Sequence, residues 1–157
     1  MEENGFLVPT SEESRALILD FQRVVSELET EFPVDCPLKH HFAPGLYARE
    51  IFLPKGSVVV GKIHKHAHVN NISQGHVMVY TEEGLQEFIA PYQFISLPGT
   101  KRVVCALEDT IWTTYHPTEE TDLEIIEQHV IAKDFEEYDK FALEQKEILR
   151  LKNEQSV

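Results

Sequence analysis

The chain has 157 residues, 42% hydrophobic and 26% charged, which is the size and composition of one soluble globular domain. Its 27 acidic residues outnumber 14 basic ones, so the formal net charge is −13 and the surface should repel nucleic acid and anionic membranes. No apolar run reaches the roughly 20 residues of a membrane span. The two cysteines, Cys36 and Cys105, form neither a disulfide framework nor a CxxC motif, so we expect a cytoplasmic protein without nucleic-acid or membrane partners.

The first predicted element is a helix over residues 11–31. Large apolar residues recur at helical intervals and form one stripe: Leu17, Phe21, Val24, Val25, Leu28 and Phe32. Thr10 and Glu13 have capping-box spacing, and Pro33 ends the helix. Residues 33–44 are predicted as a loop, so residues 1–44 form an N-terminal helix and loop.

Residues 45–131 are predicted to form a β-barrel. Short apolar runs alternate with turn residues at roughly 8–12-residue spacing, which is typical of a sandwich or small barrel and not of alternating strands and helices. The expected strands are residues 46–53, 57–63, 69–73, 76–81, 85–90, 93–97, 102–107 and 111–116, with residues 123–131 as a candidate last strand.

The last predicted element is a helix over residues 135–152, capped by Asp134. It has a partial apolar face and is otherwise strongly charged, so it either packs along the barrel or pairs with another subunit. Residues 132–157 thus flank the barrel, and the whole chain is expected to be one compact, mainly β domain.

Residues 61–68 are the most informative stretch. His64, His66 and His68 occupy alternate positions directly after a valine-rich strand. Alternate residues of an extended chain point to one side, and imidazole is a common metal ligand near neutral pH. The pattern therefore predicts a divalent metal site, without distinguishing zinc, iron, manganese and nickel. The competing interpretation is an exposed polar turn that happens to contain histidines.

Residues 53–116 resemble the cupin superfamily. The family's first motif contains an HxH pair, a glutamate and a later glycine. Here His64 and His66 match the pair, and Gly75 matches the glycine. His68 stands in the place of the glutamate. The resemblance implies a double-stranded β-helix, or jelly-roll, barrel that holds a metal near one mouth.

The second cupin motif is matched less completely. Pro98 and Gly99 resemble its proline and glycine, but Arg102 stands where the family has a histidine. The same stretch also resembles small uncharacterised cupin-like proteins encoded by bacteriophages. That resemblance places the chain in a host cytoplasm or a virion.

His116 is the candidate replacement for the missing histidine. Residues 102–107 and 111–116 are expected to form a hairpin, which would place Arg102 opposite residue 115 or 116. His116 would then join the metal ligands from the neighbouring strand. The alternative is that His116 merely precedes Pro117 at the end of a strand.

Four other residues are candidates to line a ligand cavity in the barrel: Tyr47, Arg49, Trp112 and Tyr115. For Trp112 and Tyr115, packing within the barrel is the stronger interpretation. Arg102 is a further ligand-binding candidate, because a buried arginine needs an anionic partner and so predicts a carboxylate or phosphate nearby.

Two functions are compatible with these features. The first is a non-catalytic metal-binding module in a homo-oligomer or a larger assembly, such as a phage virion. The second is a metal-dependent cupin enzyme, of dioxygenase or isomerase type, that acts on a small anionic molecule held by Arg102.

Overall fold

The computed structural model of the chain describes residues 11–31 and 34–156, so the predictions for Thr10, Phe32 and Pro33 lie outside it. The helices are α1 (Ser11–Glu31), α2 (Leu123–Val130) and α3 (Phe135–Gln155). The strands are β1 (Leu38–Ala43), β2 (Leu46–Leu53), β3 (Val58–Val60), β4 (Ile63–His64), β5 (His68–Gln74), β6 (His76–Thr81), β7 (Gly84–Ile89), β8 (Tyr92–Ser96), β9 (Val103–Ala106), β10 (Thr110–Pro117) and β11 (Ile131–Ala132). In the described part of the chain, no helix is both long and apolar enough to cross a membrane.

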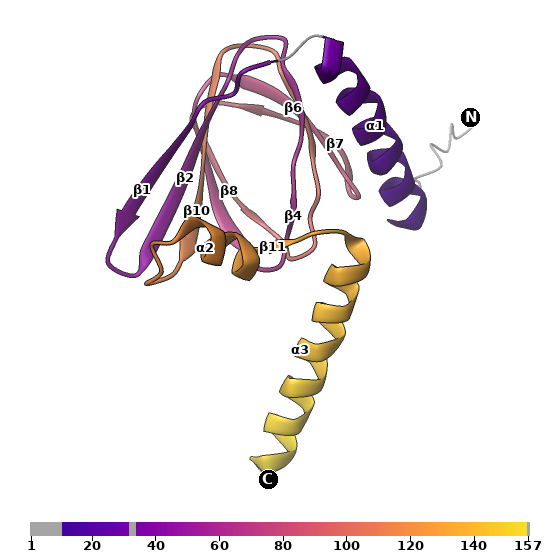
Figure 1. The fold of residues 1–157 in the computed structure, drawn as a ribbon, viewed down its shortest axis with the longest axis vertical. Helices are drawn as coiled ribbons and strands as arrows, with labels where there is room; N and C mark the ends of the chain where they lie inside the picture. The colour runs from indigo at the N-terminus through magenta and orange to yellow at the C-terminus, as the bar shows by residue number, and fades with distance from the viewer. Residues whose placement is uncertain (1–10, 32–33, 157) are drawn as a thin grey trace, which may run out of the picture.

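Two antiparallel sheets enclose the interior of the barrel (Figure 1). One has the order β1-β2-β10-β5-β8 and the other has the order β3-β9-β6-β7, while β4 and β11 form a separate pair. Residues 56–116 are all described and contain no helix. These features confirm the predicted mainly β, jelly-roll barrel with flanking helices. The predicted strand over residues 57–63 is divided into β3 and β4.

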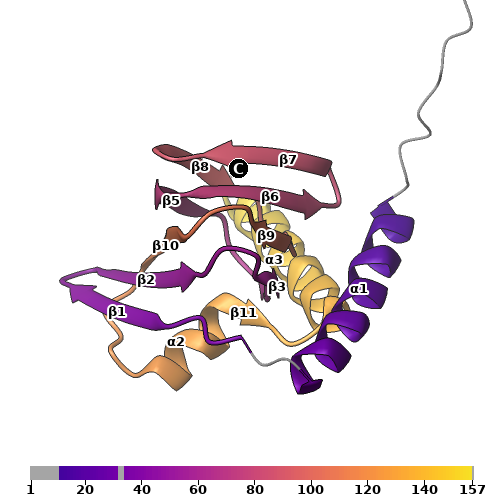
Figure 2. The same ribbon diagram turned by 90° about the horizontal axis from the view of Figure 1, so that it is seen from above.

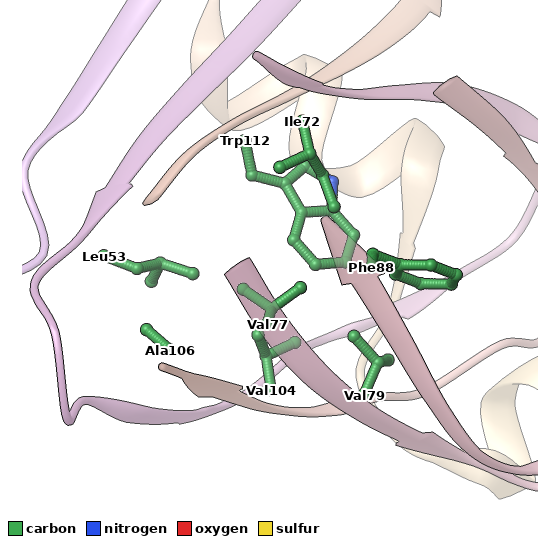
Figure 3. Packing of buried hydrophobic residues seen from close by; sticks show 8 residues of the cluster. All are labelled: Leu53, Ile72, Val77, Val79, Phe88, Val104, Ala106 and Trp112. Atoms are coloured by element: carbon green, nitrogen blue, oxygen red, sulfur yellow. The ribbon is translucent and has the colours of Figure 1, made fainter. Parts of the chain in front are cut away.

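Apolar side chains from both sheets meet in one part of the interior (Figure 3). The cluster consists of Leu53, Ile72, Val77, Val79, Phe88, Val104, Ala106 and Trp112. Ile72 and Val77 are 0% exposed. Since full burial of such a side chain contributes about 1.5–3 kcal/mol, this cluster is what holds the two sheets together.

Helix α1 has the predicted bounds but buries a different face. Ser14, Ile18 and Val25 are its buried residues, and the helix lies against β3 and β9 (Figure 2). Apart from Val25, the described part of the predicted stripe is exposed: Leu17, Phe21, Val24 and Leu28. Two adjacent apolar faces exist on this helix, and periodicity alone cannot choose between them.

Strand β1 occupies residues that were predicted as a loop. It pairs with β2 in a hairpin that places His40 opposite Arg49, and the turn contains Gly45 at φ 76°. None of its six residues is buried. The strand was missed because an edge strand exposed on both faces has no alternation of apolar and polar residues.

Helix α2 replaces the candidate last strand, which is therefore wrong. Asp122 caps it, because its carboxylate accepts hydrogen bonds from the backbone N–H groups of Glu124 and Ile125. Ile126 is the residue that the helix buries. The chain then forms β11, which pairs with β4 through Ile131 and His64.

Helix α3 starts at the predicted cap, where Asp134 accepts a 2.8 Å hydrogen bond from the N–H of Glu137. Its first turns contact the barrel: a Cβ atom on Gly99 would lie 2.5 Å from the ring of Tyr138. The rest of the helix extends away from the barrel (Figure 1), and Leu143 and Leu149 are exposed. The helix therefore packs on the barrel at one end only.

Candidate functional site

The interior of the barrel changes from apolar to polar along its strands. Alternate residues of a strand share a face, so each inward row can be followed from the apolar cluster outwards. The rows are Trp112, Thr114 and His116 on β10; Ile72, Asn70 and His68 on β5; Leu53, Ile51, Arg49 and Tyr47 on β2; and Ala106, Val104 and Arg102 on and before β9. Their polar ends meet where α2, β11 and the start of α3 lie, at the lower end in Figure 1.

Three histidines lie together at this polar end. The ring centroids are 4.3 Å apart for His64 and His68, 5.0 Å for His68 and His116, and 5.6 Å for His64 and His116. His68 and His116 are each 4% exposed. The three rings, which we call the histidine cluster, come from β4, β5 and β10.

The other predicted ligand, His66, lies outside the histidine cluster. It is exposed and contacts the ring of Phe141 on α3 edge-on, with centroids 5.4 Å apart. The alternation of side chains between the two faces of a strand does not continue from His64 to His68, because β4 ends at His64 and β5 begins at His68. Of the HxH pair, His64 therefore lies in the histidine cluster and His66 lies against Phe141 of α3.

His116 reaches the cluster by a route other than the predicted one. The hairpin of residues 102–107 and 111–116 is wrong, because β9 pairs with β3 and β6 in one sheet and β10 pairs with β2 and β5 in the other. His116 lies opposite Tyr47 of β2, and their rings stack with centroids 6.1 Å apart. His116 thus lies beside His64 and His68 as expected, although the hairpin that was expected to place it there does not form.

Tyr47 lies at the mouth and is 4% exposed. Its hydroxyl is 2.7 Å from Nδ1 of His40, which the sequence had placed in a loop. The stacked Tyr47 ring fixes one side of His116. Tyr115, another predicted lining residue, falls on the opposite face of β10 from His116 because neighbouring residues alternate.

Burial keeps the histidine cluster neutral. Desolvation, with smaller contributions from the neighbouring histidines and arginines, lowers the pKa of His64 to about 2. Desolvation likewise lowers the pKa of His116 to about 4, and it lowers the pKa of His68. Two buried nitrogens, Nδ1 of His64 and Nε2 of His68, have no hydrogen-bond partner. Neutral imidazoles with unused nitrogens are what a metal ion requires.

Two arginines face the same end of the interior. Arg102 is 8% exposed, and burial lowers its pKa to about 10. Burial also lowers the pKa of Arg49, and both charges contribute to the lowered pKa of His64. Among the described residues, neither guanidinium forms an ion pair with a carboxylate. The predicted anionic partner of Arg102 is thus not supplied by these residues.

Trp112 belongs to the apolar cluster, which bears out the packing interpretation, but it also forms the floor of the polar end. Its indole N–H donates a 3.0 Å hydrogen bond to Oδ1 of Asn70, and Nδ2 of Asn70 donates to Oγ of Ser96 at 2.6 Å. The guanidinium of Arg102 lies 5.6 Å from the centroid of the Trp112 ring. Sequence reasoning missed Asn70 and Ser96, although Asn70 lies in phase between Ile72 and His68.

A cavity of about 190 Å³ reaches Arg102 from the side of the barrel. Phe94 and Ser96 of β8 line it, together with Val79, Phe88 and residues 97–100. The histidine cluster does not line this cavity, so Arg102 lies between the cavity and the histidines.

The histidine cluster fits a metal ion in chemistry and spacing but needs side-chain rotation to bind one. Three imidazoles that share one ion at about 2.0–2.1 Å have ring centroids roughly 5 Å apart, close to the spacing in the cluster. The rings of His64 and His116 are instead stacked, with an interplanar angle of 3°. Accordingly, no group of three or more His, Cys, Asp or Glu side chains within the described residues is arranged to hold an ion.

The sequence matches no protein-family model and no curated protein. Solved structures are similar in fold. Ectoine synthase from P. lautus has a TM-score of 0.50 and 9% identity, covering 60% of this chain and 75% of that one. A cupin superfamily protein from Desulfitobacterium hafniense has a TM-score of 0.46 and 6% identity, covering 53% and 77%. KdgF from Halomonas sp. has a TM-score of 0.45 and 19% identity, covering 54% and 89%.

At these identities the similarity concerns the fold alone. Together with the two antiparallel sheets, it confirms that the barrel has the cupin fold expected from the sequence. Because cupin folds carry different activities, the function has to be argued from the site.

Proposed function

We propose that this chain is a non-catalytic metal-binding module in which His64, His68 and His116 hold one divalent ion. The observation that carries the proposal is the pair of buried, unpartnered nitrogens on His64 and His68. A buried polar atom without a partner costs free energy, roughly 1–3 kcal/mol, and a metal ion would remove that cost. The ion would supply a positive charge and open coordination positions for a further ligand.

The surroundings of the histidine cluster favour a structural role for the ion. Burial lowers the pKa of His64 most, and the charged groups that act on it are histidines and arginines; a nearby carboxylate would raise this pKa, and no described carboxylate does so. Among the described residues, no carboxylate is therefore placed to act as a general acid or base next to the proposed ion. His64 is also paired through its backbone to Ile131 of β11, so an ion on its ring would tie the C-terminal segment to β5 and β10.

The test is the metal content of purified protein after dialysis, measured by mass spectrometry. We expect one ion per chain in the wild type and in His66→Ala, whose side chain lies against Phe141. The double variant His64→Ala/His68→Ala should lose the ion, as should His116→Ala. One ion per chain in the double variant would contradict the proposal.

We also propose that the module assembles into a homo-oligomer. Large apolar side chains are exposed on three elements: Leu17, Phe21 and Leu28 on α1; Leu85 and Ile89 on β7; and Leu143 and Leu149 on α3. On α1 the exposed residues recur at helical spacing and form one apolar stripe, which contact with a second copy of the chain would bury. Sedimentation velocity should give a species heavier than one chain, and Leu17→Glu/Phe21→Glu should shift it toward the monomer. A monomeric wild type at high concentration would contradict this proposal.

A second candidate is a metal-dependent enzyme that acts on a small anionic molecule. It is favoured by Arg102, a buried cation that faces both the histidine cluster and the cavity. In that case Arg102 would orient the anionic group of the substrate, and Tyr47 would keep His116 in place.

A further inference from the structure

The cavity beside β8 has one strongly buried cation in its wall. Arg102 is 8% exposed, lines the cavity, and forms no ion pair with any described carboxylate. Its guanidinium lies 5.6 Å from the ring centroids of both Phe94 and Trp112. These rings lie beside the guanidinium but bring no negative charge. A buried charge without a counter-ion is unfavourable, so the site is prepared for an anion.

The neighbouring wall offers a second polar contact. The hydroxyl of Ser96, which also lines the cavity, accepts a hydrogen bond from Nδ2 of Asn70. Its own hydrogen remains available to donate. Arg102 and Ser96 together can therefore donate three hydrogen bonds to one planar oxyanion: two from the guanidinium and one from the hydroxyl.

The rest of the lining selects the size and character of the ligand. Val79, Phe88 and Phe94 give the cavity an apolar wall. The volume of about 190 Å³ is small for a ligand pocket, which limits the ligand to a small molecule. Glu82 and Glu83 line the same cavity, and their charges disfavour ligands with more than one negative charge.

We propose that this cavity binds a small aliphatic monocarboxylate, whose carboxylate pairs with Arg102 and Ser96 while its alkyl chain packs against Val79, Phe88 and Phe94. The site goes beyond the proposed metal-binding function and does not depend on it, because the histidine cluster does not line the cavity. Inorganic phosphate carries more charge and has no apolar part. It is therefore a poorer ligand than butyrate, whose carboxylate suits Arg102 and Ser96 and whose alkyl chain suits the apolar lining.

The test is calorimetric titration of metal-free and metal-loaded protein with butyrate, butyramide and inorganic phosphate. We expect butyrate to bind both forms of the protein with affinities within threefold of each other. Butyramide and phosphate should bind at least tenfold more weakly. In Arg102→Met the affinity for butyrate should fall at least tenfold, and Arg102→Lys should lie between. Arg150→Met removes the same charge from the exposed end of α3 and should leave the affinity within twofold.

Several results would overturn the proposal: butyrate binding only the metal-loaded protein, butyramide or phosphate binding as tightly as butyrate, or Arg102→Met binding like the wild type. A readout that needs no variant is the nuclear Overhauser effect between butyrate protons and aromatic rings. We expect contacts to Phe88 and Phe94, and contacts to other rings instead would place the ligand elsewhere. Loss of metal binding with butyrate binding intact would refute the proposed function and leave this site standing.

Discussion

The two halves of the barrel interior lie on the same strands but differ in the polarity of their buried side chains. Around Ile72 and Val77 the inward side chains are apolar and closely packed. A few residues further along the same strands, the inward side chains are polar, and His68, His116 and Arg102 are almost as deeply buried. The first half contributes stability, whereas the second leaves two histidine nitrogens without hydrogen-bond partners and two guanidiniums that pair with no described carboxylate. Because burying polar groups in this way costs free energy, this half of the barrel is the candidate binding end.

The largest difference between the halves should appear in truncation of the apolar cluster. Ile72 is 0% exposed, so Ile72→Ala should lower the free energy of unfolding by about 2–5 kcal/mol through lost burial and a residual cavity. Ile95→Ala is the matched control, because Ile95 is 68% exposed on the neighbouring strand β8 and should change the value by less than about 0.5 kcal/mol. Urea unfolding measures both. Equal effects would mean that the cluster is not the stabilising half.

The polar half should make the stability of metal-free protein depend on pH. Burial lowers the pKa of His116 from 6.5 to about 4, so the unfolded chain takes up this proton first as the pH falls. The stability is therefore greatest above pH 6.5 and decreases as the pH drops toward 4, by roughly 3 kcal/mol for this residue at the lower end.

The measurement is the free energy of unfolding between pH 7 and pH 4 in the presence of a chelator. His116→Gln should show a shallower dependence, because its amide does not titrate. A wild type and a His116→Gln variant with the same slope would show that His116 is not held neutral in the fold.

The smallest change in stability is expected at Arg102. Replacing an unpaired buried charge with an apolar side chain of similar length is neutral or stabilising, so Arg102→Met should not lower the free energy of unfolding by more than about 1 kcal/mol. Thermal unfolding with Ile72→Ala as the comparison tests this. A loss as large as that of Ile72→Ala would indicate that Arg102 has a stabilising role in the folded barrel.

The barrel was predictable because its strands are short apolar runs broken by turns. Gly75 marks one such turn: its φ is 100°, and a Cβ atom there would lie 2.6 Å from the carbonyl oxygen of Asp109. Strand β1 and helix α2 were not predicted, since the first has no buried face and the second depends on a single cap at Asp122.

The site was predictable only in part. Spacing along the chain identified His64 and His68, but it cannot say that His66 turns toward α3. The approach of His116 depends on which strands pair, and the hairpin assumed from the sequence does not exist. Arg49 was recognised as a possible lining residue. That it pairs with no described carboxylate depends on the assembled barrel and could not be predicted from the sequence. Metal binding itself stays a prediction.

The most direct test of that prediction is anomalous diffraction from crystals grown with zinc. We expect one ion per chain at the polar end of the barrel, with a nitrogen from each of His64, His68 and His116 at about 2.0–2.1 Å. An ion bound elsewhere, or no ion at the histidine cluster at saturating zinc, would contradict it.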